Sequence, residues 1–577
     1  MADYTWNAYN NFNQSHQIPF KEYGVNGILL GTFPWTSPSS VSETTDNHNY
    51  FALNAFATYE NTFAEKHYFK AMLGVNQESN HYKRLGVFAN NLVDPTKPAI
   101  NLNNDPRPSI TGAENEWALF GTVFRLNYIF NRKYLLEING RYDGSSRFSS
   151  KTRYVFTPSI SAGWRISEES FMEGIKDVVN DLKLRGSYGE LPNQGFDQNQ
   201  LYSAANFYPY IPTMPINNSL SYIFGNQTGV GVGAPGLVRN DFTWEKSATT
   251  NFGLDFAFLN NRLSGSFDLY ERRTRDMLVG GVPLPAVLGT SSPNQNAGTL
   301  ITKGWELSLG WNDKINEDLS YDLLLSFADN HSKLTKYPLN TSQIFSNWYE
   351  GKVDGEIWGF ETQGFFTSQQ EIDSAPNQSQ IWGGAWRPGD IRYVDLNNDG
   401  KIDFGNNTVS NPGDRRIIGN STPRYSFGLN LGVNYKNFDF TAFLQGIGKR
   451  DAWISNSAFW GFTSEWNVPF VYATDYWTPE NQNAAFPRLR FGNGGNSQTQ
   501  TGYLQDASYL RVKQLTLGYT LPQGWAEKVK LGRVRAYLSG QNLFTFTKLF
   551  DAFDPEVFNF QDAPQTRSFA FGLQLGF

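Results

Sequence analysis

The chain has 577 residues, no cysteine and a formal net charge of −6, and 16% of its residues are Phe, Trp or Tyr. Because the charge is mild and no basic cluster stands out, the composition argues against nucleic acid as a partner. No stretch approaches the roughly 18 uninterrupted apolar residues of a spanning helix, and the mean hydropathy is −0.47, so a helical membrane protein is excluded.

The aromatic content still fits a membrane protein of another kind. In a transmembrane β-barrel, lipid-facing and lumen-facing residues alternate, so the average hydropathy is polar, while Tyr and Trp form belts at both interfaces. The first residues, Met1 to Trp6, include neither a basic nor an apolar segment, so we expect no signal peptide. Since such a barrel must be exported, we expect a processed form, a fragment or an open reading frame without its upstream part.

Strands with period-two alternation follow one another along the chain. The first candidate, near residues 4–12, shows the pattern least clearly. Pairs of candidates separated by short turns lie at 124–130 and 134–142, at 252–258 and 263–269, and at 305–311 and 319–327. By this reading the sequence contains about 16 strands.

The clearest strand runs from Arg424 to Tyr435. Its length suits a tilted strand that crosses a bilayer in roughly 9–11 residues. One face is small and hydrophilic, as a wet lumen allows, and the other is apolar with an aromatic residue at each end. The apolar face consists of Tyr425, Phe427, Leu429, Leu431, Val433 and Tyr435.

The connections alternate between short and long. Short ones are expected near 61–65, 131–132, 260–261, 313–317 and 436–437. Long ones are expected near 79–116, 189–242, 276–299, 330–423, 448–507 and 543–566, with intermediate ones at 143–153 and 167–180. A soluble sandwich has no reason to separate loop lengths in this way, whereas a barrel inserted from the periplasm has short periplasmic turns and long extracellular loops.

These patterns predict an all-β fold class, a transmembrane antiparallel β-barrel of the outer membrane. The last strand supports this prediction, because alternate residues from Phe569 to Phe577 are apolar and the chain ends on an aromatic residue. Closing strands of outer-membrane barrels end in the same way. We therefore expect membrane lipid to surround the barrel.

One acidic segment predicts a cation site. Residues 395–403 read DLNNDGKID, which matches the first nine positions of a calcium-binding EF-hand loop. The usual final Glu is replaced by Asn406, and Asp414 is a candidate substitute. The alternative is an Asx-rich turn without metal. The candidate ligands of a structural Ca²⁺ are Asp395, Asn397, Asp399, Lys401 (through its carbonyl) and Asp403.

Two of the long loops are rich in aromatic residues. Flat rings near Asn, Gln and Asp suit sugar faces and equally suit peptide side chains, and they also pack loops together. The candidate substrate-binding residues are Trp348, Tyr349, Trp358, Trp382, Trp386, Trp460, Trp466 and Trp477. No hydrolase, zinc-protease or P-loop motif is present, so we expect neither an enzyme nor a required cofactor.

Ordered motifs between about residue 50 and the end resemble the SusC/RagA family of TonB-dependent transporters. The most extended is NYIFNRKYLLEINGRYDGSSRF, at Asn127 to Phe148. Others are at Leu182–Gly189 (LKLRGSYG), Thr243–Lys246 (TWEK), Gly389–Tyr393 (GDIRY), Tyr509–Arg511 (YLR), Gln541–Phe544 (QNLF) and Asp554–Glu556 (DPE).

The resemblance implies a barrel of about 22 strands that encloses a plug. It also implies energy supplied through TonB, a SusD-like surface lipoprotein as a lid, and import of glycan oligosaccharides or peptides. Residues 1–577 are then expected to be the C-terminal portion of the barrel domain, without the signal peptide, the N-terminal β-domain, the TonB-contacting segment, the plug and roughly six strands. The alternatives are a passive porin, a surface adhesin built on a barrel, and a soluble carbohydrate-binding β-protein.

Overall fold

The computed structural model describes most of the chain, and the described residues form two compact units. Unit 1 comprises Met1–Ala162, Tyr188–Ala248 and Arg275–Ala297, and unit 2 comprises Gly163–Ser187, Thr249–Thr274 and Gly298–Phe577. The described residues are 1–33, 36–194, 208–217, 223–224, 227–228, 231–282, 284–290, 292–344, 348–461, 470–492, 494–528, 530–557 and 565–577.

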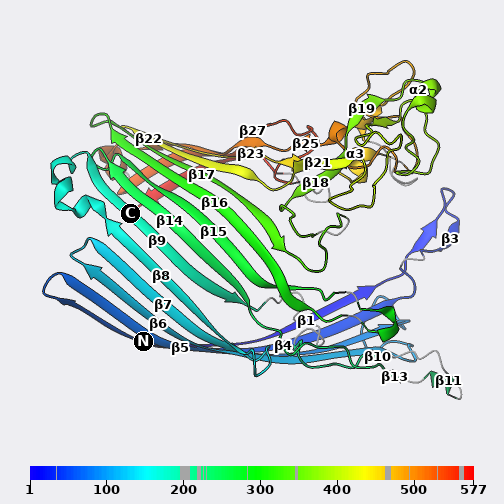
Figure 1. The fold of residues 1–577 in the computed structure, drawn as a ribbon, viewed down its shortest axis with the longest axis horizontal. Helices are drawn as coiled ribbons and strands as arrows, with labels where there is room; N and C mark the ends of the chain where they lie inside the picture. Colours follow the sequence, from blue (N-terminus) through cyan, green and yellow to red (C-terminus); the bar gives the residue numbers. More distant parts are fainter. Residues whose placement is uncertain are drawn as a thin grey trace. The chain divides into compact units, whose positions relative to one another are not determined.

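Sixteen strands form one antiparallel sheet in which neighbours in space are neighbours in the chain (Figure 1). This confirms the predicted number of strands and includes the least clear one, which is β1. The first eight in the sheet are β1 (Ala2–Gln17), β4 (Ser40–Phe63), β5 (His67–Asn90), β6 (Ser109–Phe130), β7 (Tyr134–Ser145), β8 (Tyr154–Arg165), β9 (Val179–Asn193) and β14 (Glu245–Phe258). The others are β15 (Leu263–Val279), β16 (Gln295–Lys314), β17 (Leu319–Lys336), β22 (Arg424–Tyr435), β23 (Phe438–Lys449), β26 (Tyr509–Thr520), β27 (Arg533–Thr547) and β28 (Ser568–Gly576).

In unit 1, the long strands β4, β5 and β6 correct one predicted connection. The long loop expected at 79–116 spans only residues 91–108, because β5 continues to Asn90 and β6 begins at Ser109. These ends mix polar and apolar residues on both faces, so they lack the regular hydrophobic alternation by which strands are recognised in sequence. The extension is held by a buried carboxylate: Asp46 accepts hydrogen bonds of 2.6 Å from both the Tyr82 hydroxyl and the Arg84 guanidinium.

The TWEK motif is part of a second packed region of unit 1. Trp244 packs with Phe148 and Phe242 in a buried cluster, and its indole nitrogen donates to the Arg153 carbonyl oxygen at 3.0 Å. Glu245, the next residue, accepts from the Leu278 backbone N–H at 2.6 Å. The motif therefore fixes chain segments that are far apart in the sequence.

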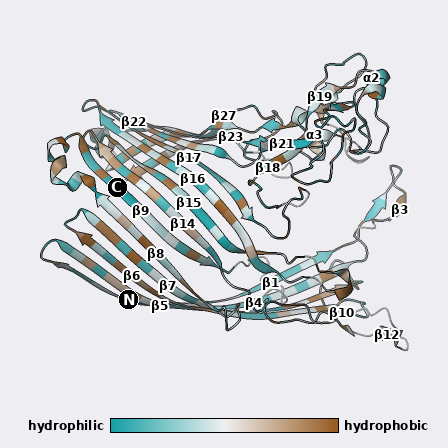
Figure 2. Ribbon diagram, viewed as in Figure 1, coloured by the Kyte–Doolittle hydropathy of each residue, from teal (hydrophilic) through white to brown (hydrophobic). Residues whose placement is uncertain are grey.

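In unit 2, apolar residues occupy one face of the sheet and align across neighbouring strands. Leu429 lies opposite Leu325 on β17 and Leu444 on β23, and Leu431 lies opposite Leu323. Hydrophobic and hydrophilic residues alternate along these strands (Figure 2). We call this side the apolar face of unit 2. β22 has the predicted bounds, Arg424–Tyr435.

Aromatic residues border the apolar face near the short turns 315–318 and 436–437. Trp311 donates its indole N–H to the Tyr321 hydroxyl at 3.0 Å. The Phe438 and Tyr519 rings lie 4.7 Å apart between centroids. Amphipathic rings collected at one level of a sheet are typical of a membrane interface.

The opposite face of unit 2 carries ion pairs. Arg185 on β9 donates to Asp268 at 2.6 and 2.7 Å and to Asp255 at 3.0 Å. Lys183 reaches the same Asp255 at 3.2 Å. Such bonds suit a face that water wets, because a charge in hydrocarbon is costly.

The connections follow the predicted alternation. On the short side, β4–β5, β6–β7, β14–β15, β16–β17 and β22–β23 are joined by 64–66, 131–133, 259–262, 315–318 and 436–437. Left-handed conformations close two of these turns, with φ of 51° and 60° at Asn131 and Arg132 and of 57° and 60° at Asn260 and Asn261. On the same side 521–532 is longer and contains the helix α4 (Gln523–Lys528). No helix among the described residues has the length and apolarity to cross a membrane.

The assignment of the two faces can be tested at neighbouring residues of β22. We expect Leu429→Arg to destabilise the assembled barrel by roughly 2–4 kcal/mol, because it places a charge at mid-depth on a face expected to contact lipid. Asn430→Arg is the matched control, since its side chain is on the opposite, polar face. Heat-modifiable migration and urea unfolding in lipid measure the difference. Equal effects of the two substitutions would show that the faces are assigned wrongly.

Candidate functional site

Three long connections of unit 2 fold together beyond one end of its strands (Figure 1). We call the described residues within 337–423, 450–508 and 548–557 the loop layer. Three short hairpin-like pairs organise it: β18 (Glu356–Phe360) with β21 (Arg415–Asn420), β19 (Thr362–Phe365) with β20 (Ile391–Tyr393), and β24 (Asp451–Ala452) with β25 (Gln505–Asp506). It also includes α2 (Gln369–Ser374) and α3 (Ser457–Trp460).

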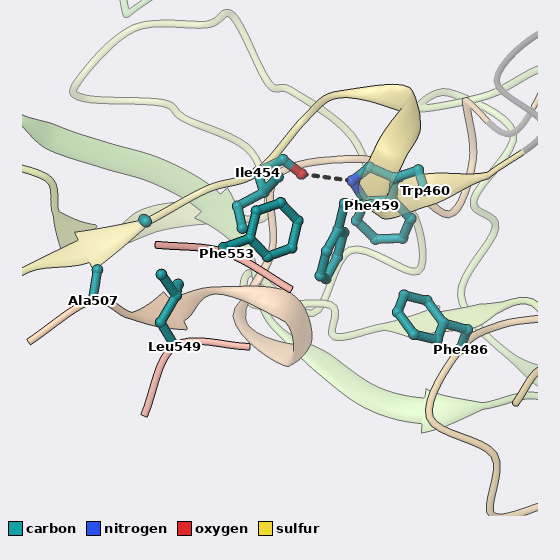
Figure 3. Packing of buried hydrophobic residues seen from close by; sticks show 8 residues of the cluster. Ile454, Phe459, Trp460, Phe486, Ala507, Leu549 and Phe553 are labelled. Carbon is teal, nitrogen blue, oxygen red and sulfur yellow. Dashed lines mark hydrogen bonds between the residues drawn. The ribbon is translucent and has the colours of Figure 1, made fainter. Parts of the chain in front are cut away.

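One apolar cluster joins the second and third of these connections (Figure 3). Phe459 and Trp460 of α3 are almost fully buried against Phe486 and, from the third connection, Leu549 and Phe553. The indole N–H of Trp460 donates to the Ile454 carbonyl oxygen at 2.8 Å, so its polar atom is satisfied inside the cluster. Burying several aromatic rings in this way gives loops a core of their own, at about 25 cal/mol for each Å² removed from water.

A second apolar cluster holds the first connection. Phe360, Ile381, Ile391, Tyr393 and Ile402 are buried together. Partly buried Tyr503 packs against this cluster and also against the first one. Its hydroxyl donates to the Ala485 carbonyl oxygen at 2.7 Å, and burial raises the pKa of Tyr503 well above its ordinary value. The two clusters are therefore linked through one side chain.

A buried carboxylate lies beside the second cluster, in the motif GDIRY. Asp390 is fully buried and accepts from the Arg490 guanidinium at 2.8 Å, the Asn496 amide at 3.0 Å and the Arg387 backbone N–H at 2.8 Å. Burial raises the pKa of Asp390, although these donors act in the opposite direction. The Arg490 guanidinium also lies over the Trp382 ring at 4.6 Å from its centroid.

Gly389 precedes this aspartate and cannot be replaced without strain. Its φ is 92°, and a β-carbon at this position would lie 2.4 Å from the Trp477 ring. Glycine thus lets the indole of Trp477 pack directly on the backbone. This contact explains the first position of the motif.

A buried arginine fastens the third connection to the sheet. Arg511 on β26 is 2% exposed and donates to Asp554 at 2.8 Å, to Glu556 at 2.6 Å and to the Thr545 hydroxyl at 2.8 Å. Lys513 reaches Glu556 at 2.7 Å. The motifs YLR and DPE, 40 residues and more apart, therefore form one ionic clamp. Both motifs are visible in the sequence, whereas their contact is visible only in the structure.

The acidic segment 395–403 folds as a sequence of Asx turns. Asp395 accepts from the Gly400 N–H at 2.8 Å, Asn397 from the Asp399 N–H at 3.0 Å, and Asp399 from the Lys401 N–H at 3.0 Å. Asp403 accepts from the Gly405 N–H at 2.6 Å. In the part of the chain that the structure describes, no three acidic or imidazole side chains are grouped closely enough to hold a metal ion. Calcium binding by Asp395, Asn397, Asp399, Lys401 and Asp403 stays a prediction.

Asp414, the candidate substitute ligand, is hydrogen-bonded to the same segment. It is fully buried and accepts from the backbone N–H groups of Leu396 and Asp403, both at 2.8 Å. Burial raises the pKa of Asp414. Its carboxylate therefore stabilises the observed backbone conformation of residues 396–403.

The predicted substrate-binding aromatics divide by burial. Tyr349, Trp460 and Trp477 are 3%, 3% and 6% exposed, which leaves almost no ring surface for a substrate. Trp358, Trp382 and Trp386 are partly buried, and Trp348 is 38% exposed. Trp466 lies outside the described residues. Substrate contact stays a prediction for all eight residues, and Trp348, Trp358, Trp382 and Trp386 have ring surface to offer to a substrate.

Comparison with known proteins decides the family. The family model for the TonB dependent receptor-like β-barrel matches residues 2–384. The chain belongs to this family. As a TonB-dependent receptor β-barrel it is located in the outer membrane, which confirms the predicted fold class and location, and the family is not one of enzymes.

Relatives and solved structures agree with this assignment. The TonB-dependent receptor P3 of Formosa agariphila is 31% identical over 475 residues, which are 80% of this chain and 44% of the relative. The TonB-dependent receptor SusC of Bacteroides thetaiotaomicron is 31% identical over 471 residues, 78% of this chain and 43% of SusC. This barrel chain thus spans less than half the length of these two relatives.

The RagAB peptide importer in its open-open state has the same fold. It superposes with a TM-score of 0.77 at 24% identity, over 100% of this chain and 59% of the importer chain. The recognised resemblance to the SusC/RagA transporters is therefore confirmed for the barrel portion.

Loss of the ionic clamp at Arg511 should make residues 548–557 of the loop layer less ordered. We expect Arg511→Met to cost roughly 3–5 kcal/mol, because it leaves Asp554 and Glu556, whose side chains are 13% and 15% exposed, without their buried partner. Limited proteolysis should then cleave 548–557 in the folded protein. Arg533→Met, at an exposed position of β27, is the control and should leave this segment resistant. Equal resistance of both variants would refute the clamp.

The calcium prediction is tested by titration and removal. We expect the purified protein to bind one Ca²⁺ that Asp395→Asn/Asp399→Asn abolishes, and that Asp373→Asn on the exposed surface of α2 retains. Chelation should lower the melting temperature of the parent protein and of the Asp373 variant but not of the double variant, since a ligand at 100 times its Kd stabilises by about 2.7 kcal/mol. Absence of saturable Ca²⁺ binding would leave the Asx turns as a structure without metal.

Proposed function

We propose that this barrel portion forms the wall and outer mouth of an active importer of glycan oligosaccharides or peptides. Two comparisons support the proposal: the family match over residues 2–384, and the superposition of the whole chain on a peptide importer. The 31% identity to SusC supports the same class. In this proposal TonB supplies the energy, through contacts outside residues 1–577, and a SusD-like surface lipoprotein covers the mouth.

The loop layer is the part of the structure that suits this role. Its two apolar clusters, the Asp390 site and the Arg511 clamp keep long connections in defined positions. A preorganised loop surface loses less conformational entropy when a ligand binds than a flexible one does. Partly exposed aromatic rings, such as Trp348 and Trp382, then offer flat surfaces to sugars or to peptide side chains.

Two aromatic positions test the substrate surface. We expect Trp348→Ala and Trp382→Ala each to lower uptake at subsaturating concentration roughly threefold to tenfold, the loss of one stacking contact of about 0.5–1.5 kcal/mol. Trp525→Ala is the matched control, because Trp525 is 66% exposed on α4, in a connection on the short side. Uptake of labelled oligosaccharides and labelled peptides by cells that carry the intact importer measures the effect and separates the two substrate classes.

Energy dependence separates active import from passive diffusion. A protonophore, or deletion of TonB, should abolish concentrative uptake by the parent protein. If uptake continues down the concentration gradient at the same rate, the protein is a porin and the proposal is wrong. If labelled substrate binds to the cell surface without entering under any condition, an adhesin is indicated instead.

A further inference from the structure

A groove crosses the apolar face of unit 2 where apolar rows meet charged residues. It has a volume of about 650 Å³ and lies over β14, β15, β16, β17 and the start of β22. Such a volume is within the range of small-molecule sites, roughly 300–1,000 Å³. Its floor is formed by Phe252, Leu269 and Trp305.

The groove is on the apolar face of unit 2, which we expect to contact the membrane. Trp305 lies opposite Asp329 in the sheet register, and Leu307 lies opposite Phe327, so these residues share the apolar face. The Trp305 and Phe327 rings meet edge to face at 4.9 Å. The next residues on the same face, away from the short turns, are charged. The groove thus runs from an apolar part of the face to a charged part, as expected of a site that spans hydrocarbon and the membrane interface.

Basic groups are in surplus at the charged end of the groove. Lys303 and Arg424 line it, and Arg273 lies beside it in contact with the lining residue Glu271. Lys303 pairs with Glu271 at 3.1 Å, and Arg273 pairs with the same carboxylate at 3.2 Å. Arg424 binds both oxygens of Asp329 at 2.5 Å. Each carboxylate is therefore already engaged, whereas the side chains of Lys303 and Arg273 remain 60% and 52% exposed. Exposed His331 lies opposite Lys303.

We propose that this groove binds one phosphate-bearing lipid of the surrounding membrane leaflet. Its acyl chain lies along Phe252, Leu269 and Trp305, and its phosphate is held by Lys303 and Arg273. Basic groups between or beside membrane-spanning segments bind anionic lipid head groups. Each Lys or Arg near the membrane surface strengthens this electrostatic attraction. The apolar floor adds the free energy of burying methylene groups. The site does not depend on import and requires only that the barrel is in the membrane.

Native mass spectrometry of the detergent-purified protein tests this site with dimyristoyl phosphatidylglycerol as the probe. We expect one saturable adduct that Lys303→Gln/Arg273→Gln weakens about tenfold. Lys314→Gln is the matched control, because Lys314 is exposed at the other end of the same strand, and its affinity should equal that of the parent protein.

Two further probes separate the contributions to binding. Dimyristoylglycerol, which has the same chains without phosphate, should bind at least tenfold more weakly to the parent protein. Inorganic phosphate alone should not compete. The proposal is overturned if phosphatidylglycerol binding is not saturable, if the double variant binds it as the parent does, or if inorganic phosphate displaces it. Because the comparison of the two lipids needs only the parent protein, the test does not depend on assembly of the variants.

Discussion

Hydrocarbon offers no partner to a backbone N–H or C=O group, and this constraint governs the sheet on which the rest of the molecule is built. A strand in a bilayer has to bond to its neighbours along its length, since each unsatisfied group costs several kcal/mol. The ladder between β17 and β22 is accordingly continuous through the apolar rows, from Leu319 to Ala328 on β17 against Tyr435 to Ser426 on β22. Once that register is set, the period of two assigns each side chain to one face.

The long connections of the chain need packing of their own to be ordered. The connections 337–423 and 450–508 are too long to be turns, and long loops without packing are poorly ordered. Here they contain apolar clusters, and Asp390 in the first of them is bonded by Arg490 and Asn496. In the third connection, Glu556 is bonded by Arg511 and Lys513. The clamp at Arg511 transfers the order of the sheet to the last connection, because the arginine belongs to β26 and its partners do not.

The sequence was informative where one physical signal dominates. Alternation over Arg424–Tyr435 predicted β22 with its bounds, because one face of this strand is apolar and the other is polar. That regular alternation is missing at the ends of β5 and β6, where polar and apolar residues are mixed on both faces, so their extension into 79–116 could not be predicted. In the loop layer, the aromatic residues are visible in the sequence, but how deeply each ring is buried is not. Trp348 and Trp460 look alike in sequence, yet one is 38% and the other 3% exposed, since burial depends on contacts with residues as distant as Phe553.

Charged side chains are neutralised in different ways on the two faces of the sheet. On the opposite face, Arg185 pairs with Asp255 and Asp268 while Lys183 pairs with Asp255, so the cluster is neutral in sum. On the apolar face, toward the long connections, charges begin beyond the Trp305 row, and there two carboxylates face Lys303, Arg273 and Arg424. A surplus of cations at an interface is favourable only if anions are supplied from outside the chain, and phosphate groups of lipids are the anions present at that level. In the proposed site, lipid phosphate therefore neutralises the basic surplus on the apolar face. On the opposite face, the aspartates of the chain neutralise Arg185 and Lys183.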